Sequence, residues 1–166
     1  MSRDFPDWVH PEKAAAARRE FAGSVPVDRM PRLAGLIVEG RATEINFHLA
    51  FGHNELGQIR VDVEISGHVP LQCQRSLRVF DHQLRSTSVV GIVLSDDEAD
   101  GLPGDYEPLV CPDNRLMLLD MVEEEILLGL PLVPVDPDSS RIGAEPATAD
   151  THRPFEALSA LKKDRD

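Results

Sequence analysis

The chain has 166 residues, of which 42% are apolar and 28% are charged, and it carries a formal net charge of −12 at pH 7. This profile is typical of one soluble globular domain and excludes a disordered chain; no apolar run approaches the ~20 residues of a membrane helix. The N-terminus has no apolar signal core, so we expect a cytoplasmic protein without membrane contact.

Two helices are predicted in the first third of the chain. Pro11 stands at an early helical position, and strong helix formers follow it as far as Gly23. A second short helix is expected from Val27 to about Leu36.

Strands are predicted where the period of the apolar residues changes to two. Apolar and polar side chains alternate over residues 45–51 and again over residues 59–73, which is the pattern of half-buried strands. The alternation resumes within residues 77–94, so we expect a hairpin that turns near Arg75. These segments predict an antiparallel sheet that could close partly into a barrel.

The next segment is acidic. Residues 95–125 hold 11 Asp or Glu side chains and a single base, Arg115, so they carry −10 of the net charge of −12. Residues 95–105 are expected to form a polar loop, and residues 106–110 a short edge strand. The spacing over residues 114–131 predicts an amphipathic helix whose apolar face covers the sheet.

Residues 131–154 contain five prolines and few apolar side chains, a composition that cannot bury enough surface to hold one conformation. We therefore expect a single α+β domain over residues 1–135, a flexible Pro-rich linker over 136–152 and a helical tail over 153–166. The tail places three apolar side chains on one stripe of a short helix, and these are Phe155, Leu158 and Leu161.

Basic side chains near the predicted hairpin are candidates for contacts with phosphate or with a partner. They are Arg75, Arg78 and Arg85, to which Lys162 and Lys163 of the tail are added. A role in keeping the protein surface soluble explains the presence of these basic residues about as well as binding does.

Acidic side chains on the predicted amphipathic helix are candidates for a face that binds a basic protein, although such a run is more often only solvated. They are Asp120, Glu123, Glu124 and Glu125. Asp120 and Glu124 lie one helical turn apart, as ligands of a divalent ion in a nuclease would, and this remains a third hypothesis.

Other chemistry is not indicated. Cys73 and Cys111 have no Cys-x-x-Cys partner, which excludes a disulfide framework and a zinc ribbon, and Cys73 is expected to be a core thiol. No Gly-rich phosphate loop, nucleophile elbow or His-Glu-x-x-His helix occurs. We expect a non-enzymatic protein with no metal and no other cofactor.

Three stretches resemble the YceD family, the large ribosomal RNA subunit accumulation proteins. They are Cys73-Gln-Arg after a strand, residues 102–109 leading into 118–135, and residues 154–162. The motif positions within them are Cys73, Tyr106, Glu107, Pro108, Pro131, Pro134 and Phe155.

The resemblance implies a role in the accumulation and processing of 23S rRNA and in assembly of the large ribosomal subunit. It suggests a factor that binds 23S rRNA or its precursor, with Arg75 as the first choice for a contact. The alternative is an acidic adaptor that binds a basic ribosomal protein or an assembly enzyme without touching RNA.

One departure from the family pattern concerns a metal. Many members carry a Cys-x-x-Cys pair at the hairpin and further cysteines after the Pro-rich segment, a spacing that looks like a structural metal site. In this chain Ser76 takes the second position and no cysteine follows Cys111. Zinc is therefore not carried over, and we expect packing to hold the hairpin.

Overall fold

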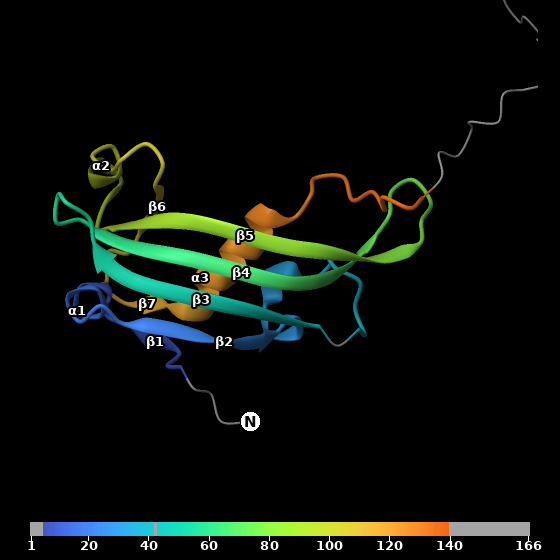
Figure 1. The fold of residues 1–166 in the computed structure, drawn as a ribbon, viewed down its shortest axis with the longest axis horizontal. Coiled ribbons are helices and arrows are strands. Elements are labelled where there is room, and N and C mark those ends of the chain that lie inside the picture. Colours follow the sequence, from blue (N-terminus) through green and yellow to red (C-terminus); the bar gives the residue numbers. More distant parts are fainter. Residues whose placement is uncertain (1–4, 42, 140–166) are drawn as a thin grey trace, which may run out of the picture.

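The computed structural model describes residues 5–41 and 43–139, and its centre is an open five-stranded sheet (Figure 1). The strand order is β2-β3-β4-β5-β6. The first four strands are antiparallel and β6 runs parallel to β5. Their bounds are β2 Glu20–Pro26, β3 Glu44–His53, β4 Ile59–Gln72, β5 Val79–Val93 and β6 Glu107–Val110.

The predicted α+β class is confirmed, and two features of the predicted sheet are corrected. The sheet does not close into a barrel, because β2 and β6 form two separate edges. The β5–β6 pair is parallel, because the chain crosses back through α2 (Asp96–Ala99) and the following loop before β6 begins. The predicted short edge strand itself is confirmed at residues 107–110.

The hairpin predicted near Arg75 is confirmed. β4 and β5 pair from Ile59↔Ile92 to Gln72↔Val79, and residues 73–78 make the turn. Within the turn, the backbone N–H of Leu77 donates to the carbonyl of Cys73 at 2.8 Å. β4 and β5 are the longest strands of the described chain, and the turn between them projects at one end of the sheet (Figure 1).

The prediction of two N-terminal helices is wrong for most of the residues concerned. The first helix, α1, spans only Pro11–Ala16, and it ends where Arg18 adopts a φ of 47°. The chain then enters β2, whose Phe21 is buried and meets Phe51 of β3 edge to face at 5.7 Å. Pairing with β3 outweighs the helix propensity of this segment. In place of the second helix there are two 3₁₀ turns, η1 (Val27–Arg29) and η2 (Pro31–Leu33).

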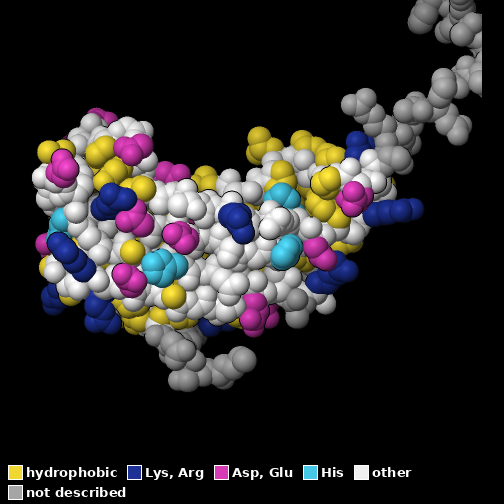
Figure 2. Space-filling view, in the orientation of Figure 1, with side chains coloured by type: hydrophobic (Ala, Val, Ile, Leu, Met, Phe, Trp, Pro, Cys, Tyr) yellow, Lys and Arg dark blue, Asp and Glu magenta, His cyan; other side chains and the backbone are white. Residues whose placement is uncertain are grey.

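The amphipathic helix is present as α3 (Leu118–Gly129). It begins later than predicted because residues 116–117 form β7 (Leu116–Met117), which pairs with β1 (Trp8–Val9) in a second, two-stranded sheet. In Figure 1, α3 lies behind the strands, so it covers one face of the large sheet. Figure 2, in the same orientation, looks onto the opposite face.

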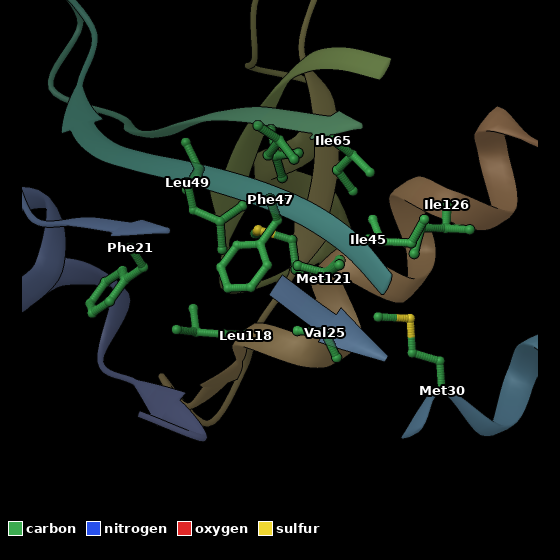
Figure 3. Close-up of a cluster of buried hydrophobic side chains, with 14 of the residues drawn as sticks. Phe21, Val25, Met30, Ile45, Phe47, Leu49, Ile65, Leu118, Met121 and Ile126 are labelled. Carbon is green, nitrogen blue, oxygen red and sulfur yellow. The ribbon is translucent and has the colours of Figure 1, made fainter. Parts of the chain in front are cut away.

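The hydrophobic core lies between α3 and the inner face of the sheet (Figure 3). Leu118, Val122 and Ile126 of α3 are fully buried there. Each such side chain contributes roughly 1.5–3 kcal/mol of burial free energy, so α3 is an integral part of the domain. The facing side chains from the strands include Val25, Ile45, Phe47, Leu49 and Ile65.

Residues 140–166 lie outside the described residues, and so do most of the predicted linker and the whole predicted tail. The start of the predicted linker is described. After α3 the chain returns to the hairpin turn, where the backbone N–H of Gln74 donates to the carbonyl of Pro134 at 2.9 Å.

Candidate functional site

The outer face of the sheet is a polar surface that no described element covers (Figure 2). The strand register places Ser24, Asn46, Ser66 and Arg85 side by side across four strands. A shallow hollow of about 340 Å³ lies over the middle of this face. We call this surface the outer sheet face; the hollow's side chains include Asn46, His48, Glu64, Ser66, Arg85 and Thr87.

Most cations of the outer sheet face are paired with acids. Arg60 pairs with Asp62, Arg41 contacts Asp81 at 2.9 Å, and His48 lies 3.2 Å from Glu20. Arg85 is exposed, and its guanidinium makes no hydrogen bond or ion pair with another described residue. A guanidinium offers five donors in a planar fork, so Arg85 is free to bind an anion.

The three predicted arginines do not form a cluster. Arg78 is exposed at the hairpin turn, whereas Arg85 lies seven residues further along β5. At about 3.3 Å per residue, this separation is about 23 Å. Arg75 lies in the turn, but its half-buried guanidinium contacts residues 136–139.

Arg75 binds the segment that follows α3. Its Nε donates to the hydroxyl of Ser139 at 2.9 Å, and its Nη2 donates to the carbonyl of Asp136 at 3.2 Å. We call residues 73–78 together with 134–139 the hairpin clasp. Within it, Arg75 has a structural role that the sequence pattern did not indicate.

Cys73 is the buried centre of the hairpin clasp. It is fully buried, as expected for a core thiol, and its sulfur accepts the backbone N–H of Ser76 at 3.4 Å and that of Asp136 at 3.3 Å. Its sulfur also lies 3.6 Å from the hydroxyl of Ser139. Burial opposes the thiolate, but the nearby Ser76 side chain, these two N–H groups and the Ser139 hydroxyl stabilise it and lower the pKa of Cys73 to about 6.

The hairpin clasp does not fit a metal ion. Structural zinc sites use four Cys or His ligands, whereas here the groups beside the Cys73 sulfur are the side chains of Ser76 and Ser139. Within residues 5–41 and 43–139, no group of three or more His, Cys, Asp or Glu side chains is placed to hold a metal. Hydrogen bonds from Arg75 and the backbone join the two chain segments instead.

The acidic face predicted on α3 is narrower than expected. Glu123 and Glu125 are buried, with only 3% and 4% of their surface exposed. Glu125 accepts hydrogen bonds from the hydroxyls of Ser86 and Ser88, the latter at 2.7 Å. Glu124 is half exposed and pairs with Arg32 at 2.6 Å, so Asp120 and Glu124 are the two acids left to face solvent.

The burial of Glu125 had a signal in the sequence. Leu118, Val122 and Glu125 are spaced i, i+4 and i+7, which places all three on the apolar stripe of a helix. An acid on such a stripe needs a polar partner inside, and Ser86 and Ser88 take inward-facing positions of β5.

Beside α3 lies an open cavity of about 650 Å³, which we call the α3 groove. Its floor is apolar and comes from α3, β6 and β7, with Val110, Met117 and Leu128 exposed at 39%, 37% and 61%. Burial, and then the charges of Glu125 and Glu124, raise the pKa of Glu107. The charged side chains of the lining are Arg32, Glu107, Asp113, Arg115, Asp120, Glu124 and Glu125.

The motif positions taken from the family fall on these sites. Glu107 and Pro108 line the α3 groove, and Tyr106 has Arg60 over its ring at 6.0 Å. Cys73 and Pro134 belong to the hairpin clasp, and Pro131 follows Leu130, the residue that caps α3. Phe155, Lys162 and Lys163 lie outside the described residues.

Comparison with known proteins finds one family. A family model described as "Large ribosomal RNA subunit accumulation protein YceD" matches residues 61–162, from β4 onward. A Haemophilus influenzae protein of the same description is 29% identical over 136 residues, which cover 78% of this chain and 75% of that protein. No solved structure matches.

In the part of the chain that the structure describes, no helix has the length and apolarity to cross a membrane.

Proposed function

The chain belongs to the YceD family of large ribosomal RNA subunit accumulation proteins, and from this premise we propose that it binds 23S precursor rRNA through its outer sheet face. Binding of this kind would support the accumulation and processing of 23S rRNA and the assembly of the large subunit in the cytoplasm. The proposed role is non-enzymatic and uses no cofactor.

The observation that carries this proposal is the position of Arg85. Its guanidinium forms no ion pair with a described acid, and it lies in one row with the neutral polar side chains of Asn46 and Ser66. RNA recognition needs a cation for a phosphate together with donors and acceptors for sugar hydroxyls and base edges. The row formed by Asn46, Ser66 and Arg85 supplies both.

Arg78 offers a second contact on the same hairpin. It is exposed, and its side chain makes no hydrogen bond or ion pair with another described residue. An RNA that lies along β5 would meet Arg85 and Arg78 at points about 23 Å apart. Arg75, whose guanidinium binds Ser139 and Asp136, is assigned to orienting the turn rather than to RNA.

The alternative, an adaptor that binds a basic ribosomal protein or an assembly enzyme without RNA, is favoured by a different feature. Asp120 and Glu124 expose their carboxylates beside an apolar groove, which suits a basic partner. The two functions use opposite sides of the sheet, so variants can separate them.

The test is the binding of a labelled 23S precursor transcript to the full chain over about 50–200 mM salt. We expect Arg85→Glu to weaken binding about tenfold or more and to reduce the salt slope by about one. Arg115→Glu, at the α3 groove, is the matched charge reversal and should bind like the unaltered chain.

Two results would overturn the RNA proposal. One is the absence of salt-sensitive binding by the unaltered chain. The other is equal binding by Arg85→Glu and Arg115→Glu. Retention of a basic ribosomal protein that is lost in an Asp120→Lys, Glu124→Lys variant, without any RNA binding, would establish the adaptor in its place.

A further inference from the structure

The α3 groove gathers exposed apolar side chains from three elements in one depression. Leu128 on α3, Val110 on β6 and Met117 on β7 open onto the same cavity of about 650 Å³. Exposed apolar surface that is gathered in one depression and bordered by charges marks a binding site.

We propose that the α3 groove is the docking site of this chain's own C-terminal segment, residues 154–163. The structure does not describe this segment, and its sequence is Pro-Phe-Glu-Ala-Leu-Ser-Ala-Leu-Lys-Lys. Its apolar residues Phe155, Leu158 and Leu161 share one stripe if the segment is helical, and this stripe matches an apolar groove. This inference does not depend on RNA binding.

The dimensions of groove and segment agree. α3 has 12 residues, and at about 1.5 Å per residue it is about 18 Å long. Ten residues in helical form span about 15 Å. The segment therefore fits beside α3 within the length that this helix offers.

The segment can also reach the groove. The described chain ends in the hairpin clasp at Ser139, and residues 140–153 leave 14 residues of connection. Such a connection spans up to about 46–50 Å when extended, and about 20 Å on average when flexible.

The distance to be covered follows from the register. Gly129, at the end of α3, packs so closely on Leu84 that an added Cβ would lie 2.7 Å from its Cδ1. Leu84 pairs with Gly67, which is six residues before Cys73 on β4. At about 3.3 Å per residue, the end of α3 is about 20 Å from the clasp, well within reach.

The charges of the α3 groove favour binding of residues 154–163. The groove lining contains five acids and two bases, and one of the bases, Arg32, already pairs with Glu124. Neither Glu107 nor Asp120 forms an ion pair with a described base, and burial, followed by the charges of Glu125 and Glu124, raises the pKa of Glu107, so an added cation would be favourable here. Lys162 and Lys163 at the end of the segment supply that charge. These two lysines are therefore assigned to the groove and not to RNA.

Disulfide trapping in the full chain tests the docking. We would place one cysteine at exposed Leu128 and one at Leu158, in a Cys111→Ala background because Cys111 also lines the groove. Since the segment is tethered, its effective concentration at the groove should be in the millimolar range. On mild oxidation we expect an intramolecular disulfide in the majority of molecules.

The matched control pairs Leu158→Cys with Thr87→Cys, on the outer sheet face. We expect this pair to cross-link at least tenfold more slowly, and Lys162→Glu, Lys163→Glu to slow the Leu128 pair several-fold. Equal rates for the two pairs would overturn the proposal, as would disulfide-linked dimers, which would seat the segment in a second copy. Because RNA binding is measured separately with Arg85→Glu, a failure of either proposal leaves the other standing.

Discussion

The backbone N–H of Arg32 donates to the buried carboxylate of Glu123 at 2.6 Å. This hydrogen bond joins η2 to α3 across 91 positions of the sequence. Beside it, the side chain of Arg32 binds the exposed neighbour Glu124. Two adjacent acids of one helix therefore have different roles, and only the second belongs to the surface.

We expect Glu123→Ala to lower the free energy of unfolding by about 1–3 kcal/mol, because it leaves the N–H of Arg32 without an acceptor inside the protein. Glu124→Ala removes an ion pair whose side chains are 51% and 46% exposed, and it should cost less than about 1 kcal/mol. Urea denaturation of both variants measures the difference. If both variants lose the same free energy of unfolding, the buried hydrogen bond of Glu123 stabilises the protein no more than the exposed ion pair of Glu124 does.

The hairpin clasp should depend on Arg75 and not on Arg78. Arg75→Ala removes the donors that bind Ser139 and the carbonyl of Asp136. We expect faster hydrogen exchange at the amide of Gln74, which donates to Pro134, while Arg78→Ala leaves this amide protected. If both variants exchange at the same rate, the clasp is held by backbone contacts alone.

The thiol of Cys73 should make stability depend on pH. Its folded pKa is lowered to about 6, below the value of about 8.5 for an unfolded thiol. Between these values the unfolded chain binds more protons, so stability rises with pH from about 6 to 8.5 and is lost again as pH falls through the folded pKa. Cys73→Ser should remove this rise.

Cys111 provides the control for this prediction. Burial raises the pKa of Cys111, so its thiol is neutral over the same range and Cys111→Ser should leave the rise intact. The measurement is the midpoint of urea unfolding at several pH values for the three proteins. A rise that persists in Cys73→Ser would assign the pH dependence to another group.

The parts of the fold that the sequence predicted correctly are those where side-chain period and environment agree. Residues 59–66 alternate, and they form the first part of β4 with Val61, Val63 and Ile65 buried on its inner side. Residues 118–129 follow the period of a helix that is apolar on one side, and they form α3. In both cases burial of one face decides the structure.

Local propensity misled the prediction where a distant partner decided the structure. Residues 20–26 follow a run of alanines, yet they form a strand because β3 pairs with them over seven positions. The clasp was missed for a similar reason. Arg75 and Ser139 are separated by 64 positions, and no local pattern reports a hydrogen bond between them.

Gly67 on β4 lies against Ile45 and Glu44 of β3, and its substitution tests the packing of these two strands. A Cβ at this position would lie 2.6 Å from Cδ1 of Ile45 and 3.0 Å from the carbonyl oxygen of Glu44. Because the second atom belongs to the backbone of the paired strand, the clash cannot be relieved by a side-chain rotation. We expect Gly67→Ala to lower the free energy of unfolding by about 1–3 kcal/mol.

Gly52 is the matched control, since it also lies in a strand but a Cβ added there would meet no atom within 4 Å. Gly52→Ala should raise stability by about 0.4–1 kcal/mol, because alanine reduces the freedom of the unfolded chain. Thermal unfolding of both variants separates strain in the strand pair from the general effect of adding a methyl group. If Gly67→Ala is as stable as Gly52→Ala, β3 and β4 can move apart at this point and the packing is looser than the contacts imply.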